Sequence, residues 1–213
     1  MARTDGTFLP AAGHDLFLPL YDPFTKLFGF DTARRRLLDQ AAFQPHHRVL
    51  DVGCGTGTLA VLIKRLYPTV GVVALDPDPK ALARAQRKAE RARVSIRFDR
   101  GFADTLGYPD AAFDRVFSSM MFHHLETTDK DKALGEIRRV LKAGGRLEFL
   151  DFAGAQSHGH GVVARLIHSH HRLEDNADDR ILERLSRVGF IEPKKVGDQS
   201  TFFGRIAYYQ ASA

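Results

Sequence analysis

The sequence has a single cysteine, Cys54, and no long apolar run. One thiol excludes an intramolecular disulfide and a zinc site made of four cysteines, and it fits a reducing compartment. No apolar stretch is long enough to cross a bilayer, and the first residues lack the apolar core of a secretory signal. These absences predict a cytoplasmic protein, and 213 residues are enough for one domain with a sizeable core.

The chain also lacks a dense basic tract interleaved with aromatic residues, although its net charge is +5. Its basic residues are mixed with acidic ones in helical stretches such as 84–94 and 136–142, which is typical of solvated helix faces. Internal repeats and low-complexity tracts are absent as well. Charge and composition therefore argue against a nucleic-acid partner and favour an ordinary globular protein.

From residue 46 onward, short apolar runs alternate with helical patterns. Strands are expected at 48–52, 71–76, 94–99, 113–119, 146–152, 194–198 and 201–210, and helices at 58–67, 79–92, 131–145 and 177–190. Pro68 stops the first helix, and Asp78 followed by Pro79 is a favourable start for the second. This alternation predicts an α/β fold with a doubly wound parallel sheet, helices on both faces, and ligands at the C-terminal ends of the strands.

Two segments lie outside the alternation, at 1–45 and 151–175. The first is rich in phenylalanine and leucine, and we expect it to form a helical cap on a domain that spans residues 46–213. The second is an insertion within that domain. It contains five histidines between His158 and His171 and a partly amphipathic pattern, which favour a lid over the substrate. No metal site is predicted, because no cysteine or carboxylate completes a ligand spacing.

The stretch VLDVGCGTG, residues 49–57, places alternating glycines directly after the first expected strand. A loop of this kind binds anionic groups at the start of a helix, and Gly55, Gly57 and Ala60 match a loose dinucleotide pattern. Asp51, however, would repel a pyrophosphate and favours a cationic ligand such as S-adenosylmethionine, which carries an ammonium and a sulfonium. Asp76 suits a ribose because it lies about 20 residues past the loop. That spacing fits NAD equally well, so an NAD-dependent dehydrogenase stays an open alternative.

Four segments carry a resemblance to a known family: VLDVGCGTG, ALDPDPKALARAQ, FDRVFSSMMFHHL and EIRRVLKAGGRLEFLDF. Over residues 46–152 they resemble the successive motifs of class I S-adenosylmethionine-dependent methyltransferases, in the ubiquinone/menaquinone-biosynthesis-like branch of methyltransferase types 11 and 25. The resemblance implies a Rossmann-like, seven-stranded sheet that is mostly parallel, with an antiparallel last strand at 201–210. It also implies S-adenosylmethionine as the cofactor and S-adenosylhomocysteine as its product.

The same resemblance implies where the cofactor is held. The residues implied as cofactor contacts are Asp51, Gly53, Cys54, Gly55, Gly57, Asp76, Pro77, Phe102, Ala103 and Ser118. One position departs from the family pattern, which commonly reads GDA after the third strand, with the Asp accepting a hydrogen bond from the adenine amino group. Here Phe102 stands at that position and cannot accept this bond, although its backbone amide and ring can still contact adenine, and Asp104 is displaced by two residues.

The methyl acceptor is expected beside the segment MMFHHL, residues 120–125, which follows the fourth expected strand. Methyl transfer is an in-line displacement that requires alignment and the exclusion of water, and a phenol or enol-like carbon also gains from the loss of a proton. His123 or His124 is the candidate base, with lining of the cofactor site as the alternative role. The candidate substrate contacts are Tyr21, His124 and Asp151.

These observations predict S-adenosylmethionine-dependent methyl transfer to a small acceptor that is apolar, phenolic or quinol-like. A phospholipid or amine N-methyltransferase and a non-catalytic protein that binds an adenosine ligand are the alternatives. The apolar N-terminal segment with Arg34–Arg36 leaves open a peripheral contact with anionic lipid. It leaves open a dimer contact as well, so the sequence is compatible with a monomer or a homodimer.

Overall fold

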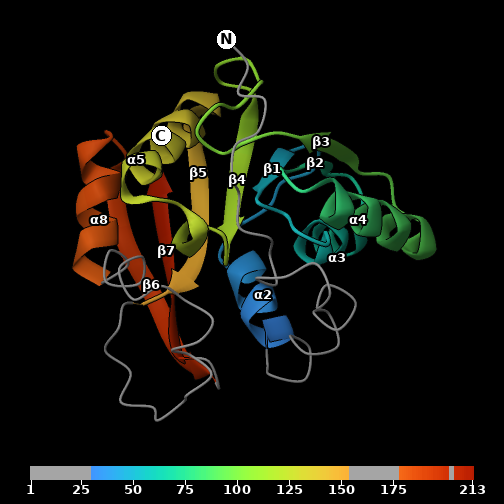
Figure 1. The fold of residues 1–213 in the computed structure, drawn as a ribbon, viewed down its shortest axis with the longest axis horizontal. Coiled ribbons are helices and arrows are strands. Elements are labelled where there is room, and N and C mark those ends of the chain that lie inside the picture. Colours follow the sequence, from blue (N-terminus) through green and yellow to red (C-terminus); the bar gives the residue numbers. More distant parts are fainter. Residues whose placement is uncertain (1–29, 154–177, 202–203) are drawn as a thin grey trace.

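The computed structural model describes residues 30–153, 178–201 and 204–213 of the chain. Its strands form one seven-stranded sheet in the order β3-β2-β1-β4-β5-β7-β6 (Figure 1). The strands are β1 (Arg48–Val52), β2 (Gly71–Asp76), β3 (Arg97–Arg100), β4 (Phe113–Ser119), β5 (Leu141–Phe152), β6 (Ile191–Thr201) and β7 (Gly204–Ser212). Strands β1 to β5 pair in parallel, whereas β7 is antiparallel to both β5 and β6. The predicted mostly parallel sheet with an antiparallel last strand is thus confirmed.

The described helices are α2 (Phe30–Asp39), α3 (Thr58–Leu66), α4 (Pro79–Ala92), the 3-10 helix η2 (Phe122–His124), α5 (Thr127–Val140) and α8 (Asp178–Arg187). Two helix ends follow the predicted local signals. Helix α4 begins at Pro79, directly after Asp78, whose carboxylate accepts the backbone N–H of Lys80 at 2.8 Å. Helix α3 ends at Leu66, just before Pro68, which cannot continue it.

The helix predicted over 131–145 extends too far toward the C-terminus. Helix α5 stops at Val140, and β5 starts at once with Leu141, which lies beside Phe113 of β4. Ala112 donates its backbone N–H to the carbonyl of Val140 at 2.8 Å, so pairing with the sheet ends the helix. The third strand, the fifth strand and the two closing strands also differ from their predicted bounds. The reason is the same, since pairing with neighbouring strands sets where a strand begins and ends.

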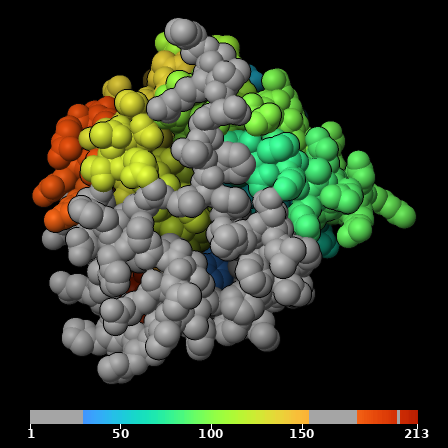
Figure 2. Space-filling view, in the orientation of Figure 1, coloured from blue at the N-terminus to red at the C-terminus, as the bar shows by residue number. Residues whose placement is uncertain are grey.

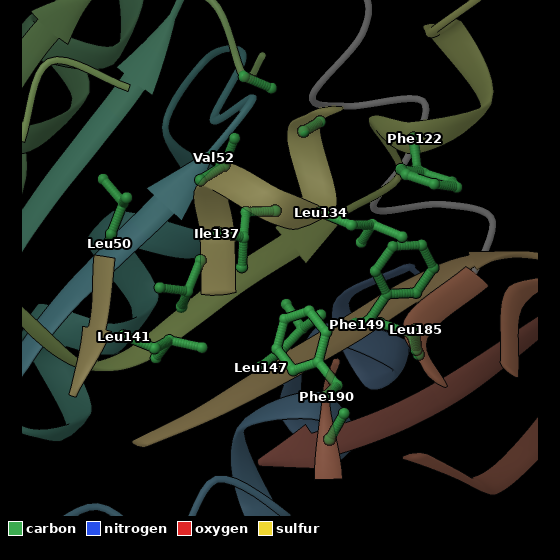
Figure 3. Close-up of a cluster of buried hydrophobic side chains, with 14 of the residues drawn as sticks. Leu50, Val52, Phe122, Leu134, Ile137, Leu141, Leu147, Phe149, Leu185 and Phe190 are labelled. Carbon is green, nitrogen blue, oxygen red and sulfur yellow. The ribbon is translucent and has the colours of Figure 1, made fainter. Parts of the chain in front are cut away.

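Both faces of the sheet are covered by helices, as a doubly wound fold requires. One buried cluster lies between the sheet and helices α5 and α8, and Figure 3 shows its side chains converging from these elements. The labelled members of that cluster are Leu50, Val52, Phe122, Leu134, Ile137, Leu141, Leu147, Phe149, Leu185 and Phe190. A second cluster includes residues of α2 and α3 packed against the strands. Figure 2 shows α5 and α8 on one flank of the molecule and α4 on the opposite flank.

The strand order brings predicted site residues to one edge of the sheet. Strands β1, β2, β4 and β5 run in the same direction, so their C-terminal ends meet there. Asp51, Asp76, Ser118 and Asp151 each lie at or within two residues of such an end. The expectation of a ligand edge therefore has a structural basis in the parallel register.

Of the predicted N-terminal cap, the described part is chiefly helix α2, which packs into the second cluster through Leu37 and Leu38. Arg115 of β4 and Arg146 of β5 each donate a hydrogen bond to the carbonyl of Ala41 at 2.7 Å. These two guanidinium groups tie the chain just after α2 to the sheet. Residues 1–29, which include Tyr21, residues 154–177, which include the five histidines, and residues 202–203 lie outside the described residues.

Candidate functional site

The glycine loop after β1 has a backbone that other residues do not readily adopt. Gly53, Gly55 and Gly57 have φ angles of +70°, +53° and +74°. A Cβ atom at Gly53 would overlap the side chain of Met121, and one at Gly57 would lie 2.7 Å from the Cβ of Ala85 in α4. Glycine is therefore required both by the left-handed backbone and by the close approach of neighbouring segments. Gly53 and Gly55 are half-buried, so this part of the loop is only partly covered by the rest of the described chain.

Asp76, the last residue of β2, connects the glycine loop to the start of α4. Its Oδ2 accepts the backbone N–H of Gly55 at 2.8 Å, and its Oδ1 accepts that of Asp78 at 2.9 Å. Burial raises the pKa of this carboxyl group above its ordinary value. A carboxylate oxygen has two lone pairs, so each oxygen can accept a further hydrogen bond from a ribose hydroxyl.

Asp51 lies within β1 and is only 1% exposed, which is deeper than the mouth of the loop where the sequence suggested it. Its Oδ2 accepts no hydrogen bond from the described part of the chain. Burial, and then the negative charge of Asp76, raises the pKa of Asp51 to about 7, although the Arg34 guanidinium and the backbone N–H of Ala60 oppose this. A buried carboxylate with an unsatisfied oxygen is suited to a cationic hydrogen-bond donor.

Ser118, near the end of β4, offers a second unsatisfied group, because its Oγ is buried and makes no hydrogen bond within residues 30–153, 178–201 and 204–213. The orphaned oxygens of Asp51 and Ser118 and the bare glycine loop fit S-adenosylmethionine. That ligand brings an ammonium group, hydroxyl groups and a sulfonium cation. The polar groups that the structure leaves unsatisfied are thus of the kind that this ligand pairs with.

The other implied cofactor contacts lie around the same edge. Pro77 follows Asp76 and is half-buried, and its carbonyl accepts a hydrogen bond from Arg100 Nε at 3.2 Å. Phe102 is half-buried and Ala103 is buried, both just past the end of β3, the strand next to β2. The sheet therefore brings these positions close to Asp76 in the order that the resemblance implies.

Cys54 and Asp104 carry weaker signals for a role in chemistry. Burial raises the pKa of the Cys54 thiol well above its ordinary value, so the thiol stays protonated and is a poor nucleophile. Asp104, displaced by two residues from the expected adenine position, accepts a bond at 3.5 Å from the neighbouring Thr105 hydroxyl. The Cys54 thiol is therefore not a nucleophile here, although the backbone of Cys54 belongs to the glycine loop.

Just after β4 and at the end of β5, His123 and Asp151 form a buried pair. His123 Nδ1 lies 2.7 Å from Asp151 Oδ1, and the two side chains are 4% and 0% exposed. The ring of the half-buried His124 lies 4.1 Å, centroid to centroid, from that of His123. The sequence suggested all three residues separately, as a base or substrate contacts, but not the pairing, which depends on the alignment of β4 with β5. The carboxylate at the end of β5 was the signal that could have indicated it.

Two residues near the candidate site carried no signal of their own in the sequence. Met121 packs against Gly53 and so joins the segment after β4 to the glycine loop. Lys130 is fully buried at the start of α5, with its Nζ 5.4 Å from the centre of the Phe122 ring. Methionine is common in packed positions and lysine is common on exposed surfaces, so neither residue stood out in the sequence.

Within the described ranges, no three histidine, cysteine, aspartate or glutamate side chains are grouped so that they could hold a metal ion. No helix among those residues is both long and apolar enough to cross a bilayer. The candidate substrate contact Tyr21 and the histidines from His158 to His171 are outside these ranges, so their roles stay predictions.

The chain is similar to known methyltransferases in sequence. Residues 49–145 match the family described as a methyltransferase domain. A demethylmenaquinone methyltransferase of Thermus thermophilus is 41% identical over 151 residues, which cover 70% of this chain and 68% of the relative. A demethylmenaquinone methyltransferase of Deinococcus radiodurans is 39% identical over 202 residues, which cover 91% of this chain and 83% of the relative. The similarity thus extends beyond the segment that matches the family.

Solved structures share the fold. The YcgJ protein of Bacillus subtilis has a TM-score of 0.72 and 18% sequence identity, covering 85% of this chain and 98% of its own. The phosphoethanolamine N-methyltransferase 2 of Haemonchus contortus, solved in complex with S-adenosyl-L-methionine, has a TM-score of 0.68 and 17% identity, covering 85% of this chain and 52% of its own. At such identities the likeness concerns the arrangement of helices and strands alone.

Proposed function

Because the chain belongs to the methyltransferase domain family and is an S-adenosylmethionine-dependent methyltransferase, we propose that its acceptor is a demethylated quinol of the menaquinone type. The observation that carries the proposal is the 39% identity with the Deinococcus relative over 91% of this chain. That alignment includes most of the two segments outside the strand–helix alternation, from which we expect the acceptor pocket to be built. Family membership also removes the NAD-dependent and non-catalytic alternatives.

We propose that the cofactor is held by the glycine loop and the residues around it. Gly53, Gly55 and Gly57 admit close approach of the methionine part and ribose, and Asp76 accepts from the ribose hydroxyls. The unsatisfied oxygens, Oδ2 of Asp51 and Oγ of Ser118, pair with the ammonium group and with neighbouring polar groups of the cofactor. Pro77, Phe102 and Ala103 lie against adenine. When bound, S-adenosylmethionine supplies a methyl group made electrophilic by its sulfonium.

The chemistry of methyl transfer favours the reduced, quinol form of the acceptor. A ring carbon must act as the nucleophile, and the carbonyl groups of a quinone withdraw electrons from it, whereas hydroxyl groups donate them. Loss of a hydroxyl proton raises the electron density at the neighbouring carbon further, so a base near neutrality is useful. His123 and His124, next to the glycine loop through Met121, are the side chains we propose for this task.

The acceptor side of the proposal also includes the predicted cap over residues 1–45 and the predicted lid at 151–175. Tyr21 is the cap residue proposed to contact the acceptor. A Tyr21→Ala variant should raise the KM for the acceptor while leaving the affinity for S-adenosylhomocysteine unchanged. Equal KM values in the variant and the parent protein would remove Tyr21 from the pocket.

The proposal is tested by offering the purified chain several acceptors with S-adenosylmethionine. The panel contains a short-chain demethylmenaquinone in its reduced and oxidised forms and a phosphatidylethanolamine, and mass spectrometry detects a gain of one methyl group. We expect carbon methylation of the reduced quinone alone. An Asp76→Ala variant, lacking the proposed ribose acceptor, is the control for contaminating activity. Transfer only to the amine would instead support an N-methyltransferase and overturn the quinol assignment.

A further inference from the structure

We propose that His123 is the catalytic base of the reaction and that Asp151 is the residue that positions it. The ring nitrogen Nε2 of His123 would take a proton from a hydroxyl group of the acceptor. This inference rests on the proposed function, since it assumes an acceptor with an ionisable hydroxyl. It selects one of the two histidines that the sequence left open and changes the role of Asp151 from a substrate contact to an orienting group.

The contacts of Asp151 determine which ring nitrogen of His123 carries a proton. Oδ1 receives the backbone N–H of Phe152 at 2.7 Å, and Oδ2 receives those of Phe122 at 2.9 Å and His123 at 3.3 Å. The carboxylate is thus an acceptor at both oxygens, and the 2.7 Å contact of Oδ1 with Nδ1 requires the imidazole to donate there. In that tautomer Nε2 carries the lone pair, so Nε2 is the basic nitrogen.

The pair is built on a rigid part of the molecule. Phe122 is fully buried, and its ring packs edge-on against Phe149 at a centroid distance of 5.1 Å within the cluster shown in Figure 3. The His123 ring makes a similar edge contact with Phe152 at 5.0 Å. This packing restricts the imidazole, and a base held in one orientation loses little entropy when the acceptor arrives.

The position of the pair also suits a base for this reaction. Met121 packs against Gly53 of the loop that we propose holds the methionine part of the cofactor, and His123 follows two residues later. Asp151 lies at the end of β5, on the same edge of the sheet as the glycine loop. The base therefore stands on the segment that joins the cofactor loop to the acceptor side.

The protons balance as follows. The O–H bond of the quinol breaks, its electron pair stays on oxygen, and the proton forms a new N–H bond at Nε2 of His123. The resulting imidazolium is stabilised by the carboxylate of Asp151 beside Nδ1. When the methylated ring carbon loses its own proton to water, His123 returns the first proton to the oxygen. One proton leaves per methyl group transferred, and neither an oxidant nor a reductant is consumed.

Two measurements test the pair, and the first needs no acceptor. Long-range proton–nitrogen NMR of the chain with ¹⁵N-labelled histidine reads the tautomer of each imidazole. We expect His123 to be protonated at Nδ1 in the parent protein and to lose this preference in Asp151→Asn. A parent protein with His123 protonated only at Nε2 would overturn the inference, even if the quinol is methylated. Failure of every quinol as acceptor would instead overturn the proposed function and leave the tautomer result standing.

The second measurement is the single-turnover rate of methylation between pH 6 and 10, with His123→Asn compared against His46→Asn. We expect the rate of His123→Asn to fall about 100-fold near pH 7, as for the loss of a general base. This loss of rate in His123→Asn should become smaller toward pH 10, where a phenol ionises without a general base. His46→Asn, the matched control at an exposed histidine before β1, should stay within about threefold of the parent protein, since general-base effects are far larger.

Asp151→Asn should show the same pH-dependent deficit as His123→Asn, while its affinity for S-adenosylhomocysteine, measured by calorimetry, stays unchanged. Because Asp151 also receives backbone N–H groups, this variant can disturb the loop, which a loss of affinity would reveal. In that case the His123→Asn profile decides, because it leaves the carboxylate in place. A deficit of equal size at every pH in His123→Asn would mean a structural role and overturn the inference.

Discussion

Replacing Asp51 by asparagine should make the protein without its cofactor more stable and, at the same time, weaken cofactor binding. The carboxylate is 1% exposed, and its pKa is raised from 3.8 to about 7, first by burial and then by the charge of Asp76. At 1.36 kcal/mol for each unit of pKa, ionising this group in the folded protein costs about 4 kcal/mol more than in water. Asparagine has nearly the same shape and carries no charge, so it avoids that cost.

The sign of the pH dependence follows from linkage. Between pH 4 and pH 7 the unfolded chain has released the Asp51 proton and the folded chain still holds it, so the contribution of Asp51 to stability falls as pH rises. It is fully present below pH 4 and lost above pH 7. The Asp51→Asn variant should therefore exceed the parent protein by up to about 4 kcal/mol in free energy of unfolding at pH 8, with little difference at pH 4.

Cofactor binding should respond in the opposite direction. A hydrogen bond between a charged donor and the Asp51 carboxylate contributes about 1.5–3 kcal/mol, so the Kd for S-adenosylhomocysteine should rise about 10- to 100-fold in the variant. In the parent protein, binding near pH 6.5 should release a proton from Asp51. Calorimetry in two buffers with different ionisation enthalpies measures that release, and the variant should not show it.

Urea unfolding at pH 4 and pH 8, with and without S-adenosylhomocysteine, is the assay for stability. Glu148→Gln is the matched control, because Glu148 is also buried with a raised pKa but bonds to Gln40 and Gln210, away from the glycine loop. It should leave the Kd unchanged. An Asp51→Asn variant that is less stable at pH 8 and binds the ligand as well as the parent protein would refute the assignment of Asp51 to the cofactor.

Gly57→Ala should lower the free energy of unfolding by about 1–3 kcal/mol in urea titrations, because a methyl group would meet Ala85 in a left-handed backbone; an unchanged midpoint would mean that the loop relaxes freely. Asp76→Asn should weaken S-adenosylhomocysteine binding by about tenfold in calorimetry, since an amide replaces one carboxylate acceptor; equal affinity would exclude the ribose role. Phe102→Asp should tighten binding of S-adenosylhomocysteine relative to its hypoxanthine analogue, which lacks the adenine amino group; an unchanged ratio of the two Kd values would place Phe102 away from the base.

Local signals in the sequence predicted much of the fold. Asp78 and Pro79 marked the start of α4 because capping involves atoms only a few residues apart. The alternation of apolar runs with helical patterns predicted β1, β2 and β4 with the bounds that they have in the structure, whereas β5 starts five residues before its predicted start. Local periodicity was not sufficient to predict where a helix gives way to a strand that pairs with the sheet. The helix predicted to reach residue 145 ends at Val140, because the chain pairs with β4 from Leu141 onward.

The sequence by itself determined the family, the glycine loop and the residues most suited to an adenosine ligand, because alternating glycines and a carboxylate at a set spacing have few other uses. Only the tertiary structure decided how the charges behave. The charge of Asp76 raises the pKa of Asp51 because β1 and β2 lie side by side, and Asp151 meets His123 because β4 is aligned with β5. The ionisation and tautomer of a buried group depend on what surrounds it in space, and that surrounding is assembled from segments far apart in the chain.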